Sequence, residues 1–332
     1  NLTYRLKNST GLLPEGHIIA EEQLPVSGEW KTNLEIKDSG KLLVKNGKNE
    51  LNFSSEKAMF TFNKTTGFIT AYNFNGEEIL KSGSELRPNF WRAPVDNDYG
   101  AGLQNRLEPW KEAMKNAELK SLTYEIKGGK ASVAAVYRLA PVNADLLLNY
   151  SINSEGELLV DFDLQLNKPE ETPMLFRVGM KMALPASYNS VQYYGRGPVE
   201  NYADRKEAAL IKIYDQTVEE QFYPYIRPQE TGNKSDVRWL DLSNQQIDLN
   251  VTANAPFNFT ALHYAMDDLD DGENREQRHI AEVDPTNSTF LFIDTAQMGL
   301  GSINSWGQLP LEKYRLTEKQ YKYSFKVSPR LK

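Results

Sequence analysis

Apolar and polar residues alternate along most of this chain, and this alternation limits the fold more than any other feature. Near the C-terminus, Tyr321, Tyr323, Phe325 and Val327 alternate with Lys and Ser, which is typical of a strand buried on one face. Similar runs predict strands at 133–139, 145–151, 157–166, 209–214, 247–252, 257–264 and 289–294. Because helical periodicity is scarce, these runs predict an all-β fold built from two large, stacked antiparallel sheets.

Turn and helix signals divide these runs. Asn75-Gly76 separates two apolar stretches and predicts a two-residue hairpin. Residues 103–119 carry apolar residues at helical spacing, and Pro109 either breaks or starts that helix. Residues 267–279 predict a short acidic helix or an ordered loop. Within them, DDLDDGE (267–273) favours a solvated acidic loop over a calcium site, because the alternate-position oxygen ligands of a calcium loop are missing.

The first 40 residues differ from the rest. Residues 16–25 predict one strand, and residues 26–38 are polar and bounded by proline and glycine, like a linker. So few strands cannot bury a core of their own. Residues 1–40 are therefore either an edge of the main domain or the tail of a preceding domain with its linker, and residues 41–332 form the main domain.

Composition excludes several classes of function. The formal net charge is −7, whereas a protein that binds nucleic acid needs a basic face. No apolar run approaches the roughly 20 residues of a membrane span, and the N-terminus lacks the layout of a signal peptide. Cysteine is absent, which excludes disulfides and thiolate chemistry, and the 3 histidines lack metal-ligand spacing. We therefore expect no metal site, no nucleic-acid partner and no membrane partner.

Four segments combine glycine or proline with charged, amide and aromatic side chains. They are NFWRAPVDNDYG (the first segment, 89–100), YGRGPVENYADR (the second, 194–205), RPQETGNKSDVRW (the third, 227–239) and MGLGSINSWG (the fourth, 298–307). Loops at one end of a sandwich have this composition when they line a polar cleft. Sugar recognition needs this mixture, because charged and amide groups match hydroxyls while an aromatic face covers the C–H side of the ring.

Eight charged and amide residues of these segments are candidates for lining the cleft or for holding its loops by pairing with one another: Arg92, Asp96, Asn97, Asp98, Glu200, Asp204, Arg205 and Arg238. Catalysis by retaining glycoside hydrolysis needs two carboxylates about 5 Å apart, one with a raised pKa. Most carboxylates here lie close to an arginine, which lowers a carboxyl pKa. We therefore assign no catalytic residue within the chain.

The four segments resemble patterns in the last domain of glycoside hydrolase family 2, specifically the large bacterial β-galactosidases. These patterns are F-x-R-A-P-x-D-N-D-x-G, G-x-G-P-x-E-N-Y-x-D-R, P-x-E-x-G and M-G-x-G-x-x-x-S-W, and they occur here in the same order. The resemblance implies a C-terminal (small-chain, fifth) domain folded as a β-supersandwich similar to galactose mutarotases. It also implies that residues 1–25 resemble the end of a preceding immunoglobulin-like domain.

In that family the nucleophile and the acid/base are glutamates on a TIM barrel, which this chain does not contain. The resemblance thus implies a retaining β-galactosidase that cleaves terminal β-D-galactose, with this chain completing the active-site wall and inactive alone. Its implied partners are a β-galactoside, the TIM-barrel domain and further copies of the enzyme. The resemblance places no cofactor in this chain, since the Mg and Na ions of the family lie on other domains.

Two site features carry over by resemblance. Trp306 matches the tryptophan that stacks on the sugar, and Gly100, Ala101 and Gly102 begin a segment that matches a mobile loop beside the pocket. Trp306 also lies in a polar, glycine-rich loop rather than an alternating strand, where a core tryptophan is usual. Trp91, Trp110 and Trp239 are interpreted as structural. The family often has GGDDSW where this chain has GSINSW, so the polar contacts beside Trp306 differ.

Two other functions stay open at this stage. A free-standing sugar-binding or mutarotase-like module would use its own cleft, but a mutarotase needs a histidine and a glutamate, and neither His263 nor His279 lies in the four segments. A pure scaffold would support contacts between subunits only. Weak galactose binding that depends on Trp306 would favour the module.

Overall fold

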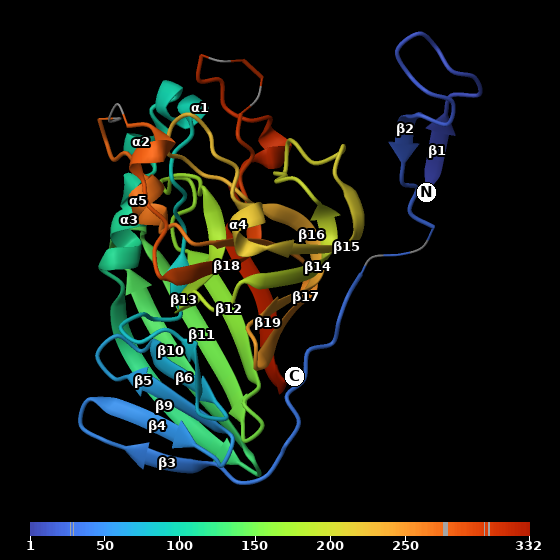
Figure 1. The fold of residues 1–332 in the computed structure, drawn as a ribbon. Coiled ribbons are helices and arrows are strands. Elements are labelled where there is room, and N and C mark those ends of the chain that lie inside the picture. Colours follow the sequence, from blue (N-terminus) through green and yellow to red (C-terminus); the bar gives the residue numbers. More distant parts are fainter. Residues whose placement is uncertain (27, 29, 275–277, 302, 305) are drawn as a thin grey trace.

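The all-β prediction is confirmed by the computed structural model, which describes residues 1–332 except 27, 29, 275–277, 302 and 305 (Figure 1). Every pairing between described strands is antiparallel. The described strands form one 12-stranded sheet, one 5-stranded sheet and one 2-stranded sheet.

The 12-stranded sheet forms the body of the molecule. Its main path runs β15-β14-β16-β17-β19-β12-β11-β10-β9, and a branch joins β17 to β18, β13 and β8. Its strands are β8 (Arg87–Asn89), β9 (Glu118–Lys127), β10 (Lys130–Leu139), β11 (Ala144–Asn153), β12 (Leu158–Leu166), β13 (Arg177–Pro185), β14 (Ser190–Gly197), β15 (Leu210–Thr217), β16 (Lys234–Ser243), β17 (Ile247–Leu262), β18 (Ser288–Gln297) and β19 (Gln320–Leu331).

The 5-stranded sheet packs against one end of this body. Its strands are β3 (Leu43–Asn46), β4 (Glu50–Ser54), β5 (Ala58–Asn63), β6 (Ile69–Phe74) and β7 (Glu77–Leu80). Aromatic rings join the two layers: Phe62 meets Tyr150 edge-on at 5.2 Å, and Phe68 stacks on Tyr137 at 5.1 Å. The apolar positions of the alternating runs therefore form one continuous core between the sheets.

The predicted strands appear with one change in their number. In β19, Tyr321, Tyr323, Phe325 and Val327 are buried, as their alternation predicts. The predicted strands 247–252 and 257–264 are instead a single strand, β17. It pairs with β16 in both parts, with β19 in its first part and with β18 in its second. The turn at Asn75-Gly76 joins β6 to β7, and both residues have positive φ, as a two-residue hairpin requires.

The helices are shorter than predicted. The predicted helix 103–119 consists of α2 (Leu103–Arg106) and α3 (Glu108–Lys115), and its last two residues belong to β9. Pro109 occupies the first turn of α3, where its missing N–H is tolerated. The other helices are α1 (Asp96–Gly100), α4 (Val218–Gln221) and α5 (Met266–Leu269), with short 3₁₀ turns at Ala140–Val142, Ile280–Glu282 and Glu312–Tyr314.

The N-terminal residues form a separate hairpin. β1 (Leu2–Arg5) pairs with β2 (Ile18–Glu22), which is shorter than the predicted strand 16–25, and both strands are exposed along their whole length (Figure 1). Residues 30–42 run along the body to β3 (Figure 1). Gln23 bonds the backbone of Ile211 on the edge strand β15, and the N–H of Thr32 donates to the carbonyl of Asn254. The hairpin is therefore not an edge of the main sheets, and its assignment to a preceding domain stays a prediction.

Candidate functional site

The four segments meet at one end of the body, as their composition predicts. The first lies between β8 and α2, the second at the end of β14, the third before and within β16, and the fourth after β18. The N–H of Glu230 donates to the carbonyl of Ala93 at 3.0 Å, which joins the third segment to the first. The N–H of Asn201 donates to the carbonyl of Asn233 at 2.8 Å, which joins the second to the third.

Arg92 joins the first segment to the fourth. It is 0% exposed, and its Nε and Nη2 donate to the Asp98 carboxylate at 3.1 and 2.8 Å. Its Nη1 donates to the carbonyl of Met298 at 2.7 Å, and Nη2 also reaches the carbonyl of Gly299 at 3.2 Å. Asp98 in turn accepts the N–H of Val95 at 2.9 Å at the start of α1. A bidentate buried pair of this kind fixes loop geometry.

Asp204 holds the same loop from the opposite side. Its two carboxylate oxygens accept the N–H groups of Leu300 and Gly301, each at 3.0 Å. A Cβ at Gly299 would lie 2.5 Å from this carboxylate, which explains the glycine there. Asn97 adds a bond from its amide to the carbonyl of Leu300 at 3.3 Å. We call the cluster of Arg92, Asp98 and Asp204 the anchor.

The prediction of a solvated acidic loop at 267–273 is correct for Asp267, Asp268 and Glu273, which are exposed, and wrong for Asp270 and Asp271. The predicted short acidic helix is present as α5, which ends at Leu269. Asp271 is buried and pairs with Arg227 and Arg278. Asp270 accepts the indole N–H of Trp91 at 2.9 Å and also pairs with Lys111. Arg227 additionally reaches Asp96 on α1 at 2.7 Å. These carboxylates therefore bind loops together, and no group of three or more potential metal ligands occurs among the residues that the structure describes.

Glu200 and Arg205 form a second cluster of polar contacts, between the second and third segments. Glu200 accepts the N–H of Gly232 at 2.8 Å and the hydroxyl of Thr231 at 3.2 Å, and it pairs with Arg205 and Tyr225. Burial and the neighbouring Glu200 carboxylate raise the pKa of Tyr225 to about 12, so this phenol stays a hydrogen-bond donor at neutral pH. Glu200 thus acts as a structural acceptor.

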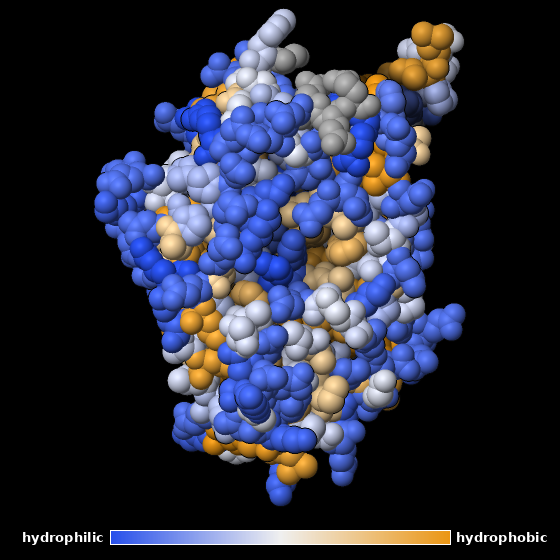
Figure 2. Space-filling model, turned by 90° about the vertical axis from the view of Figure 1, so that its left-hand side faces the viewer, coloured by the Kyte–Doolittle hydropathy of each residue, from blue (hydrophilic) through white to orange (hydrophobic). Residues whose placement is uncertain are grey.

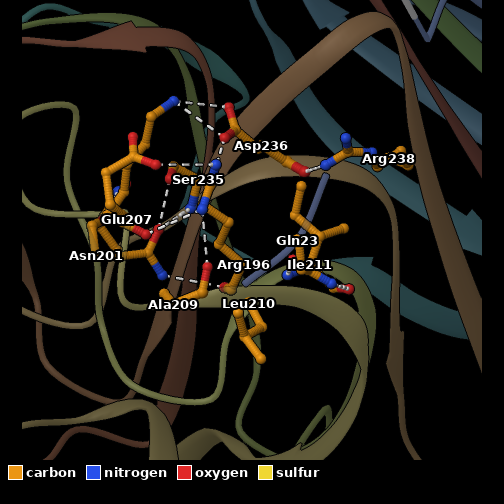
Figure 3. A network of polar contacts seen from close by, with 12 residues as sticks. Gln23, Arg196, Asn201, Glu207, Ala209, Leu210, Ile211, Ser235, Asp236 and Arg238 are labelled. Carbon is orange, nitrogen blue, oxygen red and sulfur yellow. Dashed lines mark hydrogen bonds and ion pairs between the residues drawn. The ribbon is translucent and has the colours of Figure 1, made fainter. Parts of the chain in front are cut away.

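Arg238 lies apart from the anchor, on strand β16. Its guanidinium carbon is 5.5 Å from the ring centre of Tyr194, and its Nη1 donates to the carbonyl of Asp236. Figure 3 shows this residue at the side of a network in which Arg196 donates to Asp236 at 2.6 Å. Arg238 therefore ties β14 to β16, although its sequence neighbours predict a place among the loops.

A buried charged triad was missed by the sequence reasoning. Arg177 on β13 donates to Asp294 on β18 at 3.1 Å and to Glu230 of the third segment at 3.3 Å. Burial raises the pKa of Asp294 to about 6, against the opposing effect of Arg177, and burial also raises the pKa of Glu230. One signal was available: Asp294 is a lone acid within the apolar run FLFID, a position that demands a buried partner.

Trp306 is the exposed tip of the fourth segment, with 85% of its surface accessible. Its backbone N–H donates to the side chain of Asn304 at 2.9 Å. The next residue, Gly307, has a φ of +81°, and a Cβ there would lie 2.2 Å from the carbonyl carbon of Gly100. Trp91 and Trp110 are buried, in agreement with their structural interpretation. The tip therefore lies in backbone contact with the segment predicted to be a gate.

That predicted gate is helical in the structure. Gly100 ends α1, Ala101 caps it by donating to the carbonyl of Asn97 at 3.0 Å, and Gly102 begins α2 in a left-handed conformation. The side chain of Ala101 is partly buried against the core. The mobility of this segment stays a prediction.

Comparison with known proteins agrees with the four segments. The family model described as the β-galactosidase small chain matches residues 54–327. The chain belongs to this family. The resemblance inferred from the four segments is therefore confirmed. No helix in the described part of the chain is long and apolar enough to cross a membrane.

Two curated relatives are β-galactosidases. The protein from Priestia megaterium is 29% identical over 341 residues, which cover 99% of this chain and 31% of the relative. The protein from Lactobacillus delbrueckii subsp. bulgaricus is 33% identical over 314 residues, which cover 92% of this chain and 29% of the relative. The chain thus spans about a third of the length of these relatives.

A weaker likeness exists to solved structures. The galactose 1-epimerase from Lactobacillus acidophilus NCFM superposes with a TM-score of 0.45 at 10% identity, covering 88% of this chain and 98% of that chain. A likeness of this degree supports no argument about function.

Proposed function

We propose that this chain is the C-terminal part of a retaining β-galactosidase, in which it completes the wall of an active site whose catalytic glutamates lie on another domain. The observation that supports this role is the fourth segment. Its first half is held on two sides by the anchor, while its second half presents the indole of Trp306 to solvent. Exposing a large aromatic surface on a firmly held loop is unfavourable unless a ligand or partner covers it.

Exposed apolar side chains on the same loops as Trp306 support a protein partner. They are exposed on the second, third and fourth segments and on the residues beside them: Val199, Tyr223, Ile226, Ile303, Trp306 and Leu311. Apolar side chains exposed in this number on functional loops favour a binding surface. In the proposal, the catalytic TIM-barrel domain covers most of these side chains, and Trp306 reaches the galactose that the barrel holds.

Three carboxylates in and beside the four segments have structural partners, which supports the proposal that the chemistry lies on another domain. Glu230 and Asp294 both pair with the buried Arg177, and Glu200 accepts hydrogen bonds from five donors that fix the loops. Retaining hydrolysis needs an accessible pair of carboxylates about 5 Å apart. In the proposal the chain alone is inactive, so hydrolysis of an aryl β-galactoside by the isolated chain, abolished by Glu200→Gln, would contradict it.

The role of Trp306 is tested in the assembled enzyme. We expect Trp306→Ala to raise KM for an aryl β-galactoside by about tenfold, because one aromatic stacking contact contributes roughly that factor, and Trp306→Phe to retain part of it. Trp30→Ala is the matched control, since Trp30 is a half-exposed indole that packs on Tyr194, away from the anchor. If neither Trp306→Ala nor Trp30→Ala changed KM, Trp306 would not contact the sugar and the domain would serve only as a scaffold.

A further inference from the structure

A pocket on another face of the molecule shares no residue with the four segments. It has a volume of about 420 Å³ and lies between β6, β8, β13, β18 and the start of α5. The face that is on the left in Figure 1 is hollowed near its middle, where hydrophobic surface meets strongly hydrophilic surface (Figure 2). Volumes of this size are typical of sites for small molecules.

Strand register explains why cationic and aromatic side chains share this pocket. Arg87 on β8 pairs with Lys181 on β13, and Lys181 pairs with Phe292 on β18. Residues that are directly opposite in neighbouring strands point to the same face of the sheet. Phe290 follows on the same face, two residues along β18, and also lines the pocket. One row across three strands therefore places two cations beside an aromatic wall.

Both cations have unused hydrogen-bond donors. The ammonium of Lys181 and the Nη1 group of Arg87 make no hydrogen bond or salt bridge with any residue that the structure describes, whereas Nη2 of Arg87 donates to the carbonyl of Met114. The Ser84 hydroxyl, by contrast, is already bonded to the carbonyls of Lys81 and Ala183. Leaving a half-buried cation without an acceptor is unfavourable, so this arrangement is suited to a ligand that supplies one.

The charges around Lys181 favour an anion. The pKa of Lys181 is lowered to about 8, mainly by burial; Asp267 opposes this shift, and the cations Arg87, Arg177 and Lys111 add to it. Glu85 and Asp267 also line the pocket, and a second negative charge on a ligand would be repelled by them. A ligand with one negative charge therefore fits better than a phosphate dianion.

We propose that this pocket binds a small organic carboxylate, with its oxygens between Lys181 and Arg87 and its C–H face against Phe290 and Phe292. The flat carboxylate matches the two unused donors, and the aromatic wall covers a body about the size of a sugar or phenyl ring. The body is either a sugar acid or an aryl acid. This site is independent of the proposed role of Trp306.

Calorimetric titration of the full chain at pH 7 tests the ligand class with four probes: galacturonate, 3-phenylpropionate, galactose and inorganic phosphate. We expect saturable binding of a carboxylate at millimolar concentration, and the tighter of the two acids identifies the body. Galactose and phosphate lack either the single charge or the apolar face, so we expect neither to bind comparably. Equal binding of galactose or phosphate, or no binding of either acid, would overturn the proposal.

Lys181→Met tests the assigned residue. It preserves side-chain volume and removes an unpaired cation, so the fold is retained, and we expect carboxylate affinity to fall by about tenfold or more. Lys212→Met, on the exposed edge strand β15, is the matched control and should bind as the native chain does. Native affinity in Lys181→Met would overturn the assignment.

A pH series separates a charge contact from simple packing. The charged groups near Lys181 are Arg87, Arg177, Lys111, Asp267 and Glu85. Because the pKa of Lys181 lies at about 8, carboxylate affinity should fall as pH rises through that value, and the fall should be absent in Lys181→Arg, which keeps its charge. The same fall in Lys181→Arg would show that another group controls binding.

Discussion

The fourth segment has two halves in opposite environments, and the contrast shows how this domain presents an aromatic ring. The half from Met298 to Gly301 is bonded to Arg92 on one side and to Asp204 on the other. The half that ends at Gly307 exposes Trp306 and meets the body through Gly100. A strongly held base lets an exposed tip keep its position before any ligand arrives, and such pre-organisation reduces the entropy lost on binding.

The largest effect is expected where the anchor loses its cation. In Arg92→Met, the carboxylate of Asp98 stays buried without a charged partner, and the carbonyls of Met298 and Gly299 lose their donor. We expect the free energy of unfolding, measured by urea denaturation, to fall by about 3–5 kcal/mol. Adding Asp98→Asn should recover part of this loss, because the uncompensated charge is then removed.

Arg138→Met is the control for that experiment. Arg138 pairs with Asp145 on the exposed side of β10 and β11, so its loss should lower the unfolding free energy by less than about 1 kcal/mol. If Arg92→Met and Arg138→Met gave similar losses, the fourth segment would not depend on the anchor and the contrast between its halves would fail.

The second effect concerns the contact between the tip and the body. Gly307→Ala places a Cβ 2.2 Å from the carbonyl carbon of Gly100, at a φ of +81°. Gly83 has the same φ with no atom within 4 Å of a Cβ, so Gly83→Ala measures the conformational penalty alone. In urea denaturation, we expect Gly83→Ala to lower the free energy of unfolding by about 1–2 kcal/mol. We expect Gly307→Ala to lower it by about 1–2 kcal/mol more than Gly83→Ala does. Equal losses of unfolding free energy in the two variants would show that the tip can move away from Gly100 without cost.

A smaller and pH-dependent effect is expected below the anchor, at Asp294. Its folded pKa of about 6 lies above that of an unfolded aspartate, about 3.9. The stability contributed by its bound proton is thus fully present below the unfolded pKa and is lost as pH rises through about 6. We expect the stability difference between the native chain and Asp294→Asn to change over that window by at most about 1.4 kcal/mol per pH unit.

The matched control for this pH series is Asp163→Asn, which alters an aspartate on β12 that pairs with the exposed Lys322. Its stability profile should run parallel to the native one between about pH 4 and pH 6.5. Parallel profiles for the native chain and Asp294→Asn would contradict the pKa assigned to the triad.

The sequence predicted the strands and the meeting of the four segments because both depend on local signals. Alternation at Tyr321 to Val327 requires a half-buried strand, and Asn75-Gly76 adopts the positive φ angles of a tight hairpin. Loops rich in glycine, charge and amide collect at the end of a sandwich, since they cannot join its core.

The sequence could not predict side-chain pairs that depend on how distant strands pair. Arg177 meets Asp294 only because β13 pairs with β18, and these residues are 117 positions apart. Arg238 belongs to the third segment in sequence, yet its position on β16 places it beside Tyr194. Likewise, the acids at 270 and 271 look solvated by composition, but Trp91 and Arg227 reach them from other elements. The sequence thus indicates which charged residues can form ion pairs, whereas the pairing of the strands determines which of them meet.

The smallest effect on stability is expected at the tip itself. Trp306 is 85% exposed, so Trp306→Ala should change the free energy of unfolding by less than about 0.5 kcal/mol. Trp110→Ala is the control: that indole is buried and donates to the carbonyl of Pro173, and its loss should remove about 3–5 kcal/mol. A clear loss of stability in Trp306→Ala would mean that the indole packs on the domain in solution. If Trp306→Ala leaves the free energy of unfolding unchanged but raises KM in the assembled enzyme, the indole contacts the sugar. A side chain that contributes nothing to the stability of this domain can affect KM only through a contact outside the domain.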